Sequence, residues 1–313
     1  GNYLDAHFER INSRGNASFN RMYFGDIDPA GRQQVSLLCR YDGDPAALSG
    51  GQRVNIFEGA QAASGTSGEN RWLIMAEGQQ KGDVPPLNWL FFDGGASGGD
   101  RYVDSGIPLV QDHVYALMVD QVPFARQWVG VVRDLTTGRI AAAEGLGYRT
   151  GAATAGGFLN LGGVLDAGNT MDFSVDSIQA VAVPADPAVA DAGGPYTVAV
   201  GDSLVLDGSG SFDPAGDEIV DYLWVVGEMT GQGLDAYFYD AGDQAVTELT
   251  WAQLGQHFGI EGLGEFGVLL AAQTEGGYTV WSDVTTLSVV PEPATMVLLG
   301  GAVVALARRR RRR

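Results

Sequence analysis

The sequence predicts an all-β protein of two domains followed by a C-terminal apolar helix. Glycine occupies 46 of the 313 positions and charged residues only 18%, which favours short strands and tight turns over long charged helices. The chain is also long enough to form two cores of ordinary size. We expect domains at residues 1–183 and 191–290, a Pro- and Ala-rich linker at 184–190, and a separate tail at 291–313.

The first domain alternates short apolar runs with glycine-rich turns. Candidate strands lie at residues 71–77, 88–93, 113–119, 127–134 and 139–144, and the last two flank a turn typical of a hairpin. Met171, Phe173 and Val175 alternate with polar residues, so they predict a half-buried strand. Many strands without helical periodicity predict two antiparallel sheets packed face to face, as in a jelly-roll sandwich.

The second domain shows the same strand pattern with one interruption. Its candidate strands lie at residues 196–200, 203–207, 219–226, 237–239, 267–273 and 284–289. Between Val246 and Phe258 apolar residues recur near helical spacing, with Asp243 placed to cap the start and Gly259 the end. One short helix is therefore expected inside this second β-sandwich.

Four segments of the second domain resemble the PKD family of immunoglobulin-like sandwiches. They are the Gly-Pro-Tyr of 194–196, the Leu-Asp-Gly-Ser segment of 206–211, the Asp-Pro turn of 213–217 and the Tyr-x-Trp of 222–224. The resemblance implies that Trp224 is the core indole between two sheets. The Gly-Asp-Gly usual after that strand is absent, because Gly227, Glu228 and Met229 occupy its place.

The same resemblance raises the question of a calcium site. Some members of the family bind calcium near this turn, and Asp213, Asp217 and Asp221 could supply oxygen ligands. Ala215 stands where an acid is often found, which removes one ligand. A calcium site and a plain Asx-stabilised turn therefore both stay open, and no other cofactor is expected.

The first domain resembles the concanavalin A-like and laminin-G sandwiches through its strand pattern and its closing run DFSVDSIQAV at 172–181. The resemblance implies a concave face that often binds glycans. Aromatic rings can stack on sugars, which makes candidates of Trp72, Trp89, Tyr102, Tyr115 and Trp128. Burial of the same rings in the sandwich core is the alternative.

The C-terminal tail carries the most specific pattern of the chain. Pro291, Glu292 and Pro293 precede an uncharged segment at 294–307 and six arginines that begin with Arg308, Arg309 and Arg310. The tail resembles the PEP-CTERM sorting signal, which implies a membrane-spanning helix, processing by an exosortase and delivery to the cell surface or extracellular matrix. An ordinary tail anchor, or a basic tail without function, is the alternative.

The charge of the chain argues against nucleic acid as a partner. Without residues 291–313, 13 basic residues face 37 acidic ones, a formal charge of −24. Such a surface repels phosphate groups and keeps an exported protein soluble.

Catalytic motifs are not evident. The Gly-x-Ser-x-Gly of 95–99 is not followed by a helix pattern, His7, His113 and His257 lack metal-ligand spacing, and Cys39 lies in an apolar run typical of a buried strand. We therefore expect a non-catalytic surface protein that binds glycans or exopolysaccharide, or that acts in adhesion. The alternatives are a polysaccharide-active hydrolase or lyase with an accessory second domain, and a purely structural coat protein.

Overall fold

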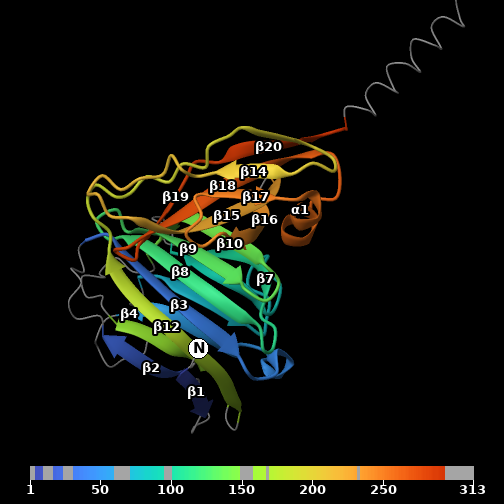
Figure 1. Ribbon diagram of the computed structural model, residues 1–313. Coiled ribbons are helices and arrows are strands. Elements are labelled where there is room, and N and C mark those ends of the chain that lie inside the picture. Colours follow the sequence, from blue (N-terminus) through green and yellow to red (C-terminus); the bar gives the residue numbers. More distant parts are fainter. Residues whose placement is uncertain are drawn as a thin grey trace, which may run out of the picture. The chain divides into compact units, whose positions relative to one another are not determined.

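The computed structural model describes residues 4–9, 17–23, 31–59, 71–94, 101–148, 158–166, 169–230 and 233–292. These residues form β-strands almost throughout, with one α-helix and one short 3-10 helix at Pro45–Ala47 (Figure 1). The chain divides into two compact units between Ala185 and Asp186, inside the predicted linker. The all-β prediction is thus confirmed.

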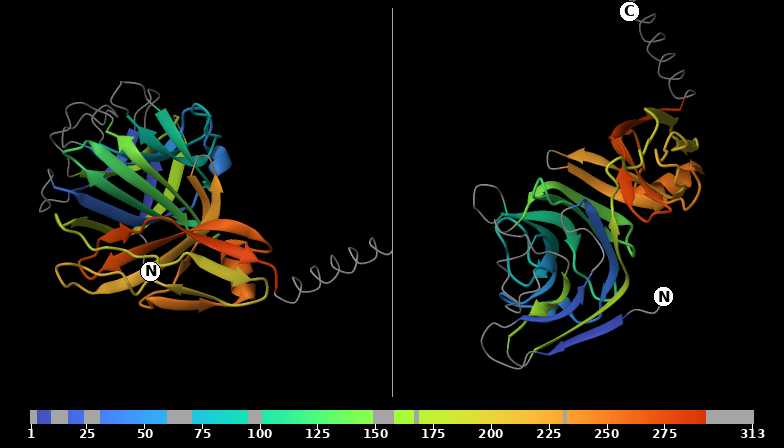
Figure 2. Two further views of the ribbon diagram at one scale, coloured as in Figure 1. Left: turned by 90° about the horizontal axis from the view of Figure 1, so that it is seen from above. Right: turned by 90° about the vertical axis from the view of Figure 1, so that its left-hand side faces the viewer.

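The first unit contains two six-stranded antiparallel sheets, whose layers are visible in Figure 2. Its strands are β1 (Leu4–Glu9), β2 (Ala17–Tyr23), β3 (Gln33–Tyr41), β4 (Arg53–Gly59), β5 (Leu73–Glu77), β6 (Asn88–Asp93), β7 (Arg101–Pro108), β8 (Val114–Val122), β9 (Gln127–Asp134), β10 (Arg139–Gly147), β11 (Phe158–Val164) and β12 (Thr170–Ala182). The first sheet has the order β1-β12-β3-β8-β9-β10, and the second has the order β2-β11-β4-β5-β6-β7. The expected hairpin is β9 and β10.

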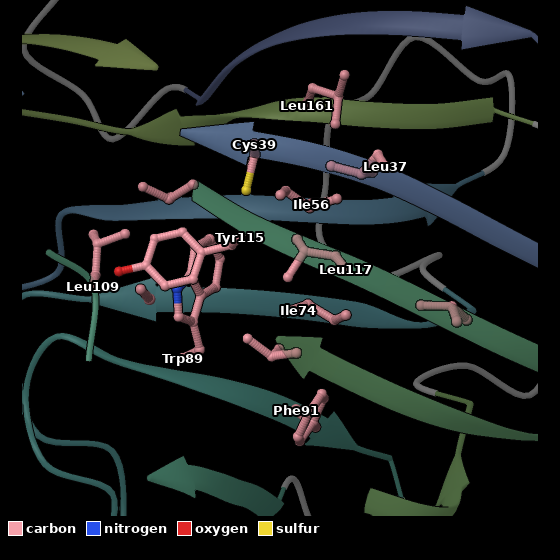
Figure 3. Close-up of a cluster of buried hydrophobic side chains, with 14 of the residues drawn as sticks. Leu37, Cys39, Ile56, Ile74, Trp89, Phe91, Leu109, Tyr115, Leu117 and Leu161 are labelled. Atoms are coloured by element: carbon pink, nitrogen blue, oxygen red, sulfur yellow. The ribbon is translucent and has the colours of Figure 1, made fainter. Parts of the chain in front are cut away.

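Alternation along the strands builds the core between these two sheets. In β3 the inward positions are Val35, Leu37, Cys39 and Tyr41, and all four are buried. Figure 3 shows Leu37 and Cys39 among aliphatic and aromatic side chains of β4, β5, β6 and β8. The thiol of Cys39 is free, and burial raises its pKa, so it serves packing.

The outer face of the second sheet carries a smaller apolar cluster. Phe57 of β4, Leu73 and Met75 of β5, and Leu90 and Phe92 of β6 are buried there, together with Val84 from the loop between β5 and β6. This loop therefore contributes to the cover over the outer face, and polar side chains of the same face are enclosed with the apolar ones.

The second unit is a smaller sandwich. Its strands are β13 (Tyr196–Ala199), β14 (Leu204–Asp207), β15 (Ile219–Thr230), β16 (Gly233–Asp240), β17 (Val246–Leu249), β18 (Gly264–Thr274), β19 (Thr279–Trp281) and β20 (Thr285–Val290). One sheet has the order β16-β15-β18-β20-β13 with β19 beside β18, and β14 and β17 form the other. Trp224 is buried at the centre of the core, as predicted.

The single helix of this unit is shorter than predicted. Helix α1 covers Trp251–Phe258 and is capped by Thr250, whose side chain accepts a hydrogen bond from the backbone N–H of Gln253 in a capping box. Gly259 ends the helix in the left-handed region, as expected. The predicted start near Asp243 is wrong, because Val246–Leu249 pairs with β14 as a strand.

Residues 186–190 of the predicted linker pack onto the second unit. Val189 exchanges two backbone hydrogen bonds with Phe212, and the backbone N–H of Ala188 donates to the hydroxyl of Tyr278. Within the described part of the chain, no helix is long and apolar enough to cross a membrane. The helix predicted at 294–307 lies outside the described residues.

Candidate functional site

Four of the five aromatic residues predicted to stack on sugars are core residues. Trp72, Trp89 and Trp128 are each 1% exposed and Tyr115 is 0% exposed. Trp89 and Tyr115 lie edge to face between the two sheets, with ring centroids 5.3 Å apart (Figure 3). A sugar needs an accessible ring face, so the prediction is corrected for these four. Only Tyr102, on the outer face of the second sheet, is not fully buried.

The predicted calcium turn is held by hydrogen bonds. One carboxylate oxygen of Asp213 accepts from the backbone N–H of Ala215, and the other accepts from the hydroxyl of Tyr278. These contacts give the Asx-stabilised geometry named as the alternative. Among the described residues, no three His, Cys, Asp or Glu side chains are grouped to hold a metal, and Asp217 and Asp221 are not brought together with Asp213 as such a group.

A carboxylate buried between the sheets has a full set of partners. Glu58, at the end of β4, accepts hydrogen bonds from Arg71, from the indole N–H of Trp72 and from the amide of Gln121. The hydroxyl of Tyr148 donates to Gln121, and burial raises the pKa of this tyrosine, which keeps it protonated as a donor. Because both Glu58 oxygens are occupied, this network stabilises the end of the sandwich.

The outer face of the second sheet presents a polar row of a different kind. Arg53 of β4 lies opposite Glu77 of β5 in the antiparallel register, so both side chains point to the same face. The guanidinium Nη1 of Arg53 lies 3.8 Å from Glu77 Oε2, and Lys81 Nζ lies 3.1 Å from Glu77 Oε1. Lys81 also lies 5.9 Å from the ring centroid of Tyr102 on β7. The row therefore extends from β4 to β7.

Two buried acceptor atoms of this face have no donor among the described residues. They are Oδ1 of Asn55, in a residue that is 4% exposed, and Oε2 of Glu77, in a residue that is 1% exposed. Asn55 and Glu77 are diagonal neighbours, because Asn55 pairs with Met75 two residues before Glu77. A buried acceptor without a donor is costly, and such groups in native proteins are explained by a ligand, water or a functional role.

The charges around Glu77 are net positive, whereas the chain as a whole is acidic. Lys81 is the only lysine of the protein, and with Arg53 it places two cations around one carboxylate. A group of this composition can accept hydrogen bonds from hydroxyl groups and can transfer a proton at a bound substrate. We define Arg53, Asn55, Glu77, Lys81 and Tyr102 as the outer-face site.

The sequence patterns identified one member of this site, Tyr102. Period-two alternation could have assigned Arg53 with Asn55, and Met75 with Glu77, to single faces of their strands. The register that aligns β4 with β5 connects residues about 20 positions apart, and no local pattern encodes it.

Comparison with known proteins identifies the tail and describes the fold. Residues 289–312 match the model of the PEP-CTERM protein-sorting motif. No curated protein matches the sequence.

Among the solved structures that match the chain are two carbohydrate-active enzymes and a lectin. The catalytic domain of a glycoside hydrolase family 131 protein from Coprinopsis cinerea is 11% identical, with a TM-score of 0.35 over 51% of this chain and 60% of that one, so the chain spans less than two thirds of its length. Alginate lyase AlyC3 is 9% identical, with a TM-score of 0.38 over 57% and 74%. Peanut lectin is 11% identical, with a TM-score of 0.34 over 57% and 91%.

These comparisons correct one prediction and confirm another. The expectation of a non-catalytic protein is contradicted, because hydrolase and lyase catalytic domains are among the matching structures. The sorting signal is confirmed, and it implies export, exosortase processing and C-terminal anchoring at the cell surface. The chain thus carries a PEP-CTERM protein-sorting motif behind two β-sandwich units, of which the first resembles jelly-roll proteins.

Proposed function

We propose that the protein is an exported enzyme that cleaves polysaccharide at the outer-face site and is sorted by an exosortase through its tail. One observation carries the assignment: among the described residues, Asn55 Oδ1 and Glu77 Oε2, on diagonally neighbouring residues, are buried acceptors that receive no hydrogen bond. The ligand that complements two neighbouring acceptors presents two hydroxyl donors, and adjacent hydroxyl groups are the defining chemistry of sugars.

The other members of the site suit the same ligand. Tyr102 is half-buried and could place one ring face against a sugar, while Lys81 sits near the same ring. The side chain of Glu77 is 0% exposed, so its carboxylate would reach the substrate and transfer a proton only once the side chains that cover it move aside. Arg53 and Lys81 would hold this carboxylate in position and would neutralise negative charge that develops on the substrate.

The second unit and the tail would place this activity at the cell surface. We assign the second unit, residues 186–290, as a PKD-like spacer, a role supported by the buried Trp224 and by the two small sheets around it. The tail would hold the protein in the membrane until exosortase processing. The partners are therefore an exosortase and an extracellular polysaccharide.

The test is to incubate the purified protein with a panel of neutral and acidic bacterial polysaccharides. Reducing ends report both hydrolysis and elimination, and absorbance from unsaturated ends separates the two. Glu77→Gln keeps the shape of the side chain and is expected to lower kcat/KM at least ~100-fold. Asn55→Leu is expected to raise KM with a smaller effect on kcat, because it removes an acceptor that binds the substrate.

Glu144→Gln is the matched control, since Glu144 is an exposed carboxylate on β10 of the other sheet, and its activity should equal that of the parent protein. Circular dichroism confirms that each variant is folded. Binding of glycans without any release of ends would contradict the enzymatic assignment. Absence of both binding and release would favour a structural coat protein.

A further inference from the structure

The sorting motif begins inside the last strand of the second unit. The motif match starts at residue 289, whereas β20 continues to Val290. Figure 1 shows β20, in red, as the final element of this unit. The first two residues of the matched motif are therefore part of a folded sheet, with no spacer between the domain and Pro291.

These two residues are held on both sides. Val289 pairs with Gly264 of β18 and with Val198 of β13, and it is 5% exposed in the core of the unit. Val290 pairs with Ala199, and its carbonyl accepts a hydrogen bond from the backbone N–H of Val200 at 3.0 Å. The end of β20 is thus fixed by pairing and by burial.

Pairing stops at the residue where the Pro-Glu-Pro segment begins. Pro291 has no backbone N–H, so it cannot continue the ladder, and it is half-buried. Glu292 is exposed and lies beside the turn after β13, where a Cβ on Gly201 would be 3.5 Å from Glu292 Oε1. The acid of the motif is therefore accessible directly at the edge of the domain.

A protease that binds its substrate as an extended segment needs several free residues on both sides of the bond that it cuts. Here the residues before Pro291 are paired, so they become free only when the end of β20 frays. We propose that the second unit restricts the membrane protease to the chain from Pro291 onward, and that fraying of the β20 end limits the rate of processing. This inference rests on exosortase processing and is independent of the polysaccharide activity.

The test uses the full chain in a bacterial host that contains the exosortase. A flexible spacer of about eight Gly and Ser residues is inserted between Val290 and Pro291, and loss of the tail is followed by pulse-chase and intact mass. Processing is expected to accelerate at least several-fold. The same insertion after Gly216, in an exposed turn before β15, is the control and should leave the rate unchanged.

Two further measurements decide the inference. Val289→Ala weakens the packing of the strand end and should also accelerate processing, whereas an unchanged or slower rate would contradict the fraying step. The mature product of the parent protein should retain Val290. A C-terminus upstream of Val290, or an unchanged rate with the spacer, would overturn the inference; a parent protein that keeps its tail would overturn it together with exosortase processing.

Discussion

At the scale of single residues, two glutamates of neighbouring strands show how partners decide a role. Glu58 and Glu77 are both buried, but Glu58 accepts hydrogen bonds at both oxygens, whereas Oε2 of Glu77 accepts none from the described residues. A carboxylate whose two oxygens both accept hydrogen bonds from the protein stabilises the fold. A carboxylate with an oxygen that accepts none can accept a hydrogen bond from a ligand. The sequence alone does not separate the two cases.

Removal of the Glu58 carboxylate should destabilise the first unit. Glu58→Ala leaves Arg71 as a buried cation without this counter-charge, which is expected to lower the free energy of unfolding by about 3–5 kcal/mol. Urea denaturation measures the change. The control Glu144→Gln should stay within about 0.5 kcal/mol of the parent protein, because it alters an exposed side chain. Equal stability of both variants would contradict the structural role of the Glu58 network.

At the scale of elements, helix α1 illustrates how local chemistry and long-range pairing divide a segment. Apolar spacing predicted a helix that begins near Asp243, but residues 246–249 pair with β14 instead. The capping box at Thr250 and Gln253 then sets the true start. Strand pairing overrides the helical spacing because it buries Leu249 in the core.

The cap should contribute measurably to stability. Thr250→Ala removes the side-chain oxygen that accepts from the N–H of Gln253 and is expected to cost about 1 kcal/mol in the unfolding of the second unit. Thr250→Ser retains this oxygen and should be close to the parent protein in the same denaturation experiment. A loss of equal size in both variants would show that the methyl group, not the cap, is responsible.

At the scale of the whole molecule, burial of tyrosines links stability to alkaline pH. Burial, assisted by the charge of Asp44, raises the pKa of Tyr41 to about 12, and burial also raises the pKa values of Tyr115 and Tyr148. The pKa of a tyrosine in the unfolded chain is about 10. The raised pKa therefore adds stability that is complete below about pH 10 and is lost as the pH rises toward 12.

We accordingly expect the urea midpoint of the first unit to fall gradually above about pH 8.5, where the Cys39 thiol ionises only in the unfolded chain, and to fall steeply above about pH 10, where the tyrosines add to the loss. Tyr41→Phe lacks one of these ionisations, so its midpoint should fall less over the same range. A midpoint that declines equally in the variant and in the parent protein would contradict the contribution of Tyr41.

Sequence patterns by themselves determined the all-β fold class and the sorting tail, because these follow from local periodicity, composition and a contiguous motif. The Met171, Phe173 and Val175 alternation, for example, places all three in the core as predicted. Only the tertiary structure decided three properties: which aromatic rings are buried, which buried carboxylate accepts hydrogen bonds at both oxygens, and how β20 holds the start of the sorting motif. These properties depend on the register of strands that are distant in the sequence, and no local pattern encodes that register.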